Sequence, residues 1–101
     1  MSDRIIYHIT SAQEWDLAQS QGEYEPRQFA AEGFIHCSHA HQLEAVMKRF
    51  FQGQTDLVVL EINSAALKCD VIEENLEGGA ELYPHIYGKL PLDAVIDCKY
   101  F

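Results

Sequence analysis

Three histidines of this chain each lie inside a short apolar run, in the segments Tyr7-His8-Ile9-Thr10, Ile35-His36-Cys37-Ser38 and Pro84-His85-Ile86-Tyr87. A strand residue with apolar neighbours tends to be at least half buried, and a buried imidazole needs a hydrogen-bond partner, a ligand or a metal. Because the three segments come from distant parts of a small chain, we expect the imidazoles to converge on one site.

A hydroxyl group accompanies each of these histidines. Side chains two positions apart on a strand share a face. By this alternation Thr10 lies beside His8, Ser38 beside His36, and Tyr87 beside His85. Such pairs suit polar recognition of ribose or phosphate. Alternatively, each hydroxyl only satisfies its own histidine inside the core.

Ser38 also precedes a helical pattern. Apolar residues at the spacing i, i+3, i+4, i+7 predict a helix over residues 39–52, with Ser38 as its N-cap. The free amides at that helix start could bind a phosphate or carboxylate. Cys37 stands next to His36, but adjacent strand residues point to opposite faces. We therefore predict that Cys37 is a small buried residue and not an activated nucleophile.

His36, Cys37, His39 and His41 lie close together in the sequence and resemble a metal-binding cluster. Structural zinc usually takes four nitrogen or sulfur ligands, often as two pairs. The sequence has no second close Cys/His pair, so no metal site is predicted. His39 and His41 are expected to be solvent-exposed residues of a first helical turn.

Charge and composition limit the classes of partner. Seven basic against sixteen acidic residues give a formal net charge of −9, which argues against binding to DNA or to anionic membranes. No apolar stretch approaches the roughly 20 residues that span a bilayer. The odd number of cysteines and the start of the sequence, which lacks a signal-peptide pattern, predict reduced thiols and a cytoplasmic location. The oligomeric state is left open.

The remaining patterns predict the elements that must position these residues. Residues 4–9 and 34–37 indicate strands, and Ser11-x-x-Glu14 predicts a capped helix that Gly22 ends. Residues 23–33 are expected to form a loop with one helical turn, and 64–67 a further turn. Strands are expected at 56–63, where both faces are apolar, and at 70–74, 83–88 and 92–101, with a Gly78-Gly79 loop between the middle two. The fold class predicted is α+β, a single domain over residues 1–101 with mixed or antiparallel sheets and two main helices.

Several of these segments together resemble the bacterial family called domain of unknown function 952. The resemblance rests on Tyr7-His8-Ile9-Thr10, Gly33-Phe34-Ile35-His36-Cys37-Ser38, Glu74, Gly78-Gly79 and Pro84-His85-Ile86-Tyr87-Gly88, and covers nearly the whole chain. It implies an ADP-ribosyltransferase-like architecture, in which two small sheets enclose a cleft that binds NAD in the enzymes.

The resemblance also implies roles for individual residues. The cofactor-binding residues would be His8, Thr10, Ser38 and Tyr87. Glu74 would stabilise the positive charge that develops on the ribose, while His36 and His85 would shape the acceptor side. NAD or a related phosphorylated nucleotide is therefore the candidate small-molecule ligand. The alternative is a ligand-binding or protein-interaction domain without catalytic activity.

Overall fold

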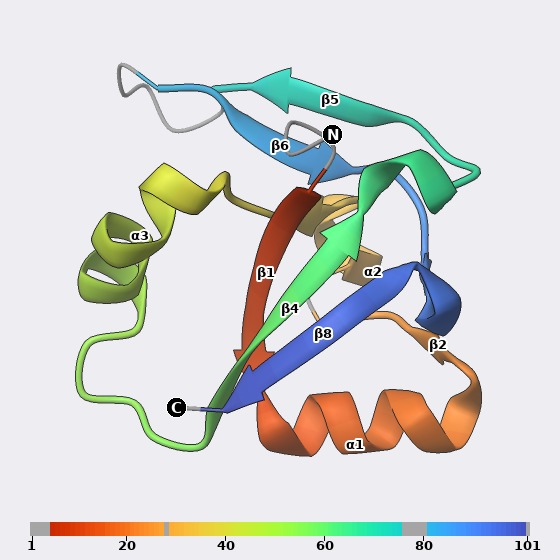
Figure 1. The fold of residues 1–101 in the computed structure, drawn as a ribbon, viewed down its shortest axis with the longest axis horizontal. Helices are drawn as coiled ribbons and strands as arrows, with labels where there is room; N and C mark the ends of the chain where they lie inside the picture. Colours follow the sequence, from red (N-terminus) through yellow and green to blue (C-terminus); the bar gives the residue numbers. More distant parts are fainter. Residues whose placement is uncertain (1–4, 28, 76–80, 101) are drawn as a thin grey trace.

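The computed structural model of the chain describes residues 5–27, 29–75 and 81–100, whose strands form three antiparallel sheets beside two longer helices (Figure 1). One sheet has the order β1-β4-β8, another the order β3-β6-β5, and β2 pairs with β7. The α+β class with antiparallel sheets is thus confirmed. In chain order the elements are β1 (Ile5–Ser11), α1 (Ala12–Gln21), β2 (Glu23–Tyr24), α2 (Phe29–Glu32), β3 (Ile35–His36), η2 (Ala40–Gln42), α3 (Leu43–Phe50), β4 (Leu57–Asn63), η3 (Ser64–Ala66), β5 (Val71–Glu74), β6 (Tyr83–Ile86), β7 (Leu90–Pro91), η4 (Leu92–Ala94) and β8 (Val95–Tyr100).

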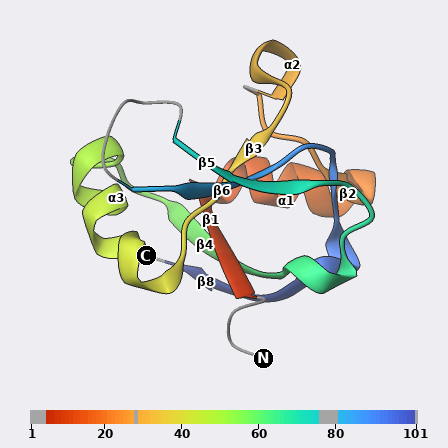
Figure 2. The ribbon, with the colours of Figure 1, turned by 90° about the horizontal axis from the view of Figure 1, so that it is seen from above.

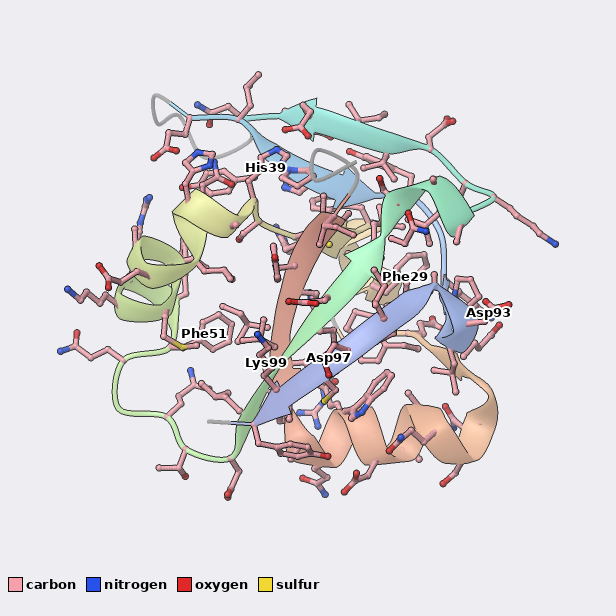
Figure 3. All side chains as sticks on the ribbon, viewed as in Figure 1. Phe29, His39, Phe51, Asp93, Asp97 and Lys99 are labelled. Atoms are coloured by element: carbon pink, nitrogen blue, oxygen red, sulfur yellow. The ribbon has the colours of Figure 1, made fainter. Side chains whose placement is uncertain are left out.

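Strand β4 is the centre of the first sheet, between β1 and β8. The side chains on its two faces belong to two hydrophobic clusters. Val58, Leu60 and Ile62 pack in the larger core, whereas Leu57 and Val59 pack against α3. Phe51, labelled in Figure 3, belongs to the side chains between α3 and the sheet. The prediction of a strand covered on both faces is confirmed.

Helix α1 begins and ends where the sequence predicted. The Ser11 hydroxyl accepts the Glu14 backbone N–H at 3.1 Å, and Gly22 ends the helix with a positive φ of 88°. The reciprocal contact of a capping box is absent among the described hydrogen bonds, because the Glu14 carboxylate turns instead to Thr10 and to the backbone of Arg27. That departure brings a carboxylate to the end of β1.

The prediction that Ser38 caps a helix over 39–52 is wrong. Ser38 forms a β-bridge with Tyr7, with N–H to carbonyl distances of 2.7 and 2.8 Å in the two directions. His39 is the N-cap of the short η2 turn, and α3 follows only from Leu43. The backbone amide of Ser38 is already used by β1, so this residue tethers the two sheets to each other.

Strand β8 also differs from its simple alternating pattern. Simple alternation along this strand would place Ile96 on the same face as Cys98, yet the exposed fraction of Ile96 is 57%. A register shift in the pairing with β4 falls between Glu61 and Ile62, and such a bulge reverses which residues face inward beyond it. Val95, which pairs with Ile62, therefore packs against the core on the same side as Cys98.

The β3-β6-β5 sheet lies across one end of the first sheet, as Figures 1 and 2 both show. The link between them is the segment after β3, where the Cys37 N–H bonds to the Pro84 carbonyl and Ser38 bonds to Tyr7. The Gly78-Gly79 loop predicted before β6 lies outside the described residues. Among the described residues, no helix is long and apolar enough to cross a membrane.

Candidate functional site

The three histidines lie together at the junction of the two sheets. His36 on β3 is paired with His85 on β6 across the antiparallel ladder, and their ring centroids are 5.0 Å apart. His8 on β1 reaches the same place, because its Nδ1 bonds to the backbone carbonyl of His36. The expected convergence is therefore present in the structure.

Burial differs among the three. His8 and His85 are buried, with exposed fractions of 7% and 4%, as predicted. His36 is buried only to just over half, since 46% of its side chain is exposed. The cause is its face: His36 points away from the core into which its neighbours Ile35 and Cys37 are buried.

A hydrogen-bonded chain runs through the buried end of β1. His8 Nε2 lies 2.7 Å from the Tyr24 hydroxyl, and that hydroxyl lies 2.8 Å from Thr10 Oγ1. Thr10 in turn lies 3.2 Å from Glu14 Oε2. His8 and Thr10 share a face as predicted, but Tyr24 from β2 connects them. Both ring nitrogens of His8 are thus engaged by the protein.

The environment of His8 keeps its imidazole neutral. Burial lowers the pKa of His8 from 6.5 to about 4, and the bond to the His36 carbonyl and the nearby Glu14 charge only partly oppose that effect. Burial also raises the pKa of the Tyr24 phenol. At neutral pH the imidazole of His8 and the phenol of Tyr24 are therefore both uncharged.

A second cluster surrounds His85. Phe34 stacks on the His85 ring with centroids 4.5 Å apart, and it also contacts His36 and Tyr87. Glu74 Oε2 lies 3.4 Å from His85 Nδ1. The Tyr87 hydroxyl donates to the Glu74 carboxylate, with a distance of 3.0 Å to Oε1, and this bond raises the pKa of Tyr87. In the structure, the predicted residue Glu74 thus contacts both of the other predicted residues, His85 and Tyr87.

A cavity of about 530 Å³ opens beside the hydrogen-bonded chain that runs from His8 to Glu14. Its residues from β1 include His8 and Thr10, and those from the β3 segment include His36 and Ser38. Aromatic side chains from three other segments complete the wall, namely Tyr24, Phe50, Phe51 and Tyr83. Pockets for small molecules typically combine such an apolar wall with a few placed polar groups.

The charged residues of the cavity wall are acidic. Glu14 and Glu32 line the cavity, and no lysine or arginine is among the described residues that do. Glu32 is bonded to the exposed edge of His36 at 3.1 Å. An adjoining hollow shares Ser11 and Glu14 with the cavity and includes Arg27. A ligand in the main cavity therefore meets carboxylates, hydroxyls and imidazole, and meets a guanidinium only at its border.

Glu74 and Tyr87 are not among the described residues that line this cavity. They lie instead with Phe34 around His85, which itself reaches the cavity wall. The sequence therefore assigned to one site residues that belong to two neighbouring clusters.

Three residues that line the cavity are not predicted as site residues from the sequence. Tyr24 lies in a polar segment with no strand pattern, and only its pairing with β7 brings it inward. The sequence pattern predicts Glu14 only as a helix-capping residue, and it predicts no role for Glu32. The sequence contains one signal for Glu14 as a site residue. Its carboxylate lies in the first turn of a helix that directly follows a polar strand residue.

Cys37 and the histidines near it in the sequence are the candidates for a nucleophile and for a metal site. Cys37 is buried, and burial raises the pKa of its thiol, so it is not an activated nucleophile. Within residues 5–27, 29–75 and 81–100, no group of three or more His, Cys, Asp or Glu side chains is arranged to hold a metal ion. His39 and His41 stack on each other and contact Glu73 and Glu81 respectively.

Comparison with known protein families shows to which family the chain belongs. Residues 9–98 match the family described as protein of unknown function (DUF952). The chain belongs to this family. No match was found among the curated proteins.

Solved structures of protein CC0527 from Caulobacter crescentus are similar to the chain. The X-ray structure has a TM-score of 0.83 at 36% identity, covering 93% of this chain and 82% of that one. The solution NMR structure has a TM-score of 0.80 at 36% identity, covering 97% and 83%. The family match thus shows DUF952 membership, and the similarity to these solved structures supports the antiparallel α+β fold.

Proposed function

We propose that this DUF952 protein binds a small nucleoside-type ligand, NAD or a related nucleotide, in the cavity beside His8 and Thr10. The observation that carries the proposal is the lining itself, in which buried polar side chains sit at the base of an aromatic wall. The ADP-ribosyltransferase-like architecture implied by the family resemblance adds support, because its cleft between two sheets binds NAD.

The acidic lining determines which part of such a ligand fits. Hydroxyl and amide N–H groups of a ribose or a nicotinamide can donate to Glu14, Glu32 and Thr10. A diphosphate would be repelled by the two carboxylates and has Arg27 as its nearest cationic partner, in the adjoining hollow. The nucleoside part therefore belongs in the cavity, and any phosphates belong at its border.

Binding without turnover is favoured over ADP-ribosyl transfer. Transfer requires a carboxylate next to the ribose, and Glu74, the residue expected in that role, lies outside the cavity wall. Its hydrogen bonds to Tyr87 and its contact with His85 suit a positioning role for the β5-β6 edge. We therefore infer that the cavity belongs to a binding domain without catalytic activity.

The test is a ligand titration followed by thermal and chemical denaturation. A ligand at 100 times its Kd adds about 2.7 kcal/mol to the free energy of unfolding. We expect NAD or a nucleoside to stabilise the wild type, and the isosteric Thr10→Val variant to lose this response. Ser20→Ala is the matched control, because Ser20 is an exposed hydroxyl of α1 that bonds only to the Asp16 carbonyl among the described contacts.

The titration set includes NAD, ADP-ribose, nicotinamide, nucleosides and phosphorylated nucleotides. No stabilisation by any of them would contradict the proposal and favour the protein-interaction alternative. Release of nicotinamide from bound NAD would instead establish turnover, and its loss in Glu74→Ala would restore Glu74 as the electrostatic group.

A further inference from the structure

Strand β8 lies at one edge of the sheet β1-β4-β8 (Figure 1). Within the part of the chain that the structure describes, β8 pairs with β4 on one side and with no strand on the other. In an antiparallel ladder, alternate residues of such a strand direct their backbone N–H and C=O groups away from the neighbouring strand. An exposed edge of this kind is a template for a further strand.

The residues along this edge have a symmetric order around Cys98. The sequence Ile96-Asp97-Cys98-Lys99-Tyr100 has opposite charges one position from Cys98 and large apolar side chains two positions from it. The four residues that flank Cys98 are all exposed, and Figure 3 labels the two charged ones on β8. A strand with this order is complementary to an antiparallel copy of itself.

We propose that β8 pairs with β8 of a second copy of this chain, antiparallel and centred on Cys98, so that two sheets join into one. A two-fold axis at Cys98 places Asp97 of each copy opposite Lys99 of the other. The same axis places Ile96 of each copy opposite Tyr100 of the other. Opposite charges and pairs of an aromatic with a β-branched residue are both favourable across strands.

The charges select this register over its neighbours. Centring the pair on Asp97 would put two carboxylates opposite each other, and centring it on Lys99 would do the same with two ammonium groups. An axis between Cys98 and either neighbour would put each charge opposite an uncharged residue. Because like charges directly opposite each other are destabilising, the register centred on Cys98 is favoured.

The surroundings of Asp97 within one chain are acidic. Asp97 stands opposite Glu61 in the ladder with β4, while Lys99 Nζ lies 3.7 Å from Glu61 Oε1. Asp97 Oδ1 accepts the backbone N–H of Cys98 at 2.8 Å. In the paired copies, Lys99 of the second copy brings an ammonium group to Asp97 on the side away from Glu61. This contact offsets the repulsion between the two carboxylates of one chain.

Two features limit the strength of the association. Each chain has a formal net charge of −9, so two copies repel each other at long range. The register shift between Glu61 and Ile62 leaves Ile96 without a partner on β4, and such a bulge bends an edge strand. The charged positions lie beyond the bulge, in the regular stretch from Asp97 to Tyr100. We therefore expect a dimer that dissociates on dilution.

Sedimentation over a range of protein concentrations tests the pairing, with no ligand added. Asp97→Lys and Lys99→Asp each turn the two attractive pairs of the interface into two repulsive ones. We expect each variant to raise the Kd of the dimer by about tenfold or more, which corresponds to about 1.4 kcal/mol. Asp93→Lys, at an exposed position just before β8, changes the net charge equally and should leave the Kd within about twofold of the wild-type value.

A mixture of the two charge variants gives the decisive result. One variant then carries two positive side chains at positions 97 and 99, and the other carries two negative ones. We expect the mixture to form a heterodimer at concentrations where each variant alone is a monomer. The double variant Asp97→Lys/Lys99→Asp restores the same pairs within one sequence, so it repeats the test if one single variant does not fold.

Three results would overturn the proposal. The wild type could remain a monomer up to millimolar concentration, which would mean that the charges of β8 only protect its edge. Association that both charge variants leave unchanged would place the interface elsewhere. A mixture that associates no more than its components would exclude the register centred on Cys98.

NMR of a sample that mixes isotope-labelled and unlabelled protein locates the interface directly. We expect intermolecular contacts between Asp97 of one copy and Lys99 of the other. Intermolecular contacts centred on a different residue or element would contradict the proposal. The pairing of β8 is independent of the ligand cavity, so a failure of nucleotide binding leaves this test unaffected.

Discussion

Acid should destabilise the folded protein through His8, and the size of the effect follows from its environment. In the unfolded chain His8 has its ordinary pKa of 6.5, whereas burial lowers the pKa to about 4 in the folded protein. Between these two values the unfolded chain binds a proton that the folded protein does not. Each unit of pKa difference corresponds to about 1.4 kcal/mol, so the total is about 3 kcal/mol.

The direction of the pKa shift of His8 determines the pH range over which stability is lost. The folded state keeps its full stability with respect to His8 above about pH 6.5 and loses it progressively as the pH falls toward about pH 4. A loss of about 3 kcal/mol is a large part of the 5–15 kcal/mol that holds a typical domain together. Acid unfolding should therefore begin well before the carboxylates are protonated.

The assay compares urea unfolding of the wild type and His8→Gln across this range. At neutral pH the variant should be less stable by about 1–3 kcal/mol, because hydrogen bonds to Tyr24 and to the His36 carbonyl are lost. Since glutamine does not titrate, acidification should change the stability difference by about 3 kcal/mol in favour of the variant, so that the two curves meet or cross. Substitution of the exposed His41 by Gln controls for removal of an imidazole.

Parallel stability curves for the wild type and His8→Gln would refute this reasoning. They would mean that His8 binds protons equally in the folded and unfolded states, which is incompatible with a desolvated imidazole. An increase in the stability of the wild type relative to His8→Gln as the pH falls would also refute it, because the pKa of His8 would then be raised by folding.

Three further predictions concern packing and reactivity. Gln42→Ala should lower the free energy of unfolding by about 1–3 kcal/mol, because the buried amide donates to the Leu82 carbonyl at 2.9 Å; urea unfolding measures it. Cys37 should resist a thiol reagent in the native protein while the partly exposed Cys69 reacts, as mass mapping will show; fast labelling of Cys37 would contradict its burial. Gly88→Ala should destabilise the fold by about 1–3 kcal/mol, because its new Cβ would lie 2.7 Å from Cys69 Cβ and Sγ; an unchanged melting temperature would show that this contact relaxes freely.

Local patterns predicted much of the fold. Ser11 and Gly22 delimit α1 because capping and a left-handed φ are properties of a few neighbouring residues. Strand β4 was identifiable because apolar residues on both of its faces require cover on both sides. The β8 pattern failed at Ile96 because a bulge depends on the partner strand and not on β8 itself.

The same distinction holds for the candidate site. The sequence by itself determined that His8 and His85 are buried, and that Thr10 shares a face with His8. Tertiary structure decided the partners: β2 pairing brings Tyr24 between His8 and Thr10, and the first turn of α1 brings Glu14 to the cavity. Strand alternation is a local rule, whereas hydrogen-bond partners distant in sequence depend on how the sheets pack. That packing left Glu74 with Tyr87 and made Glu14 the carboxylate beside His8.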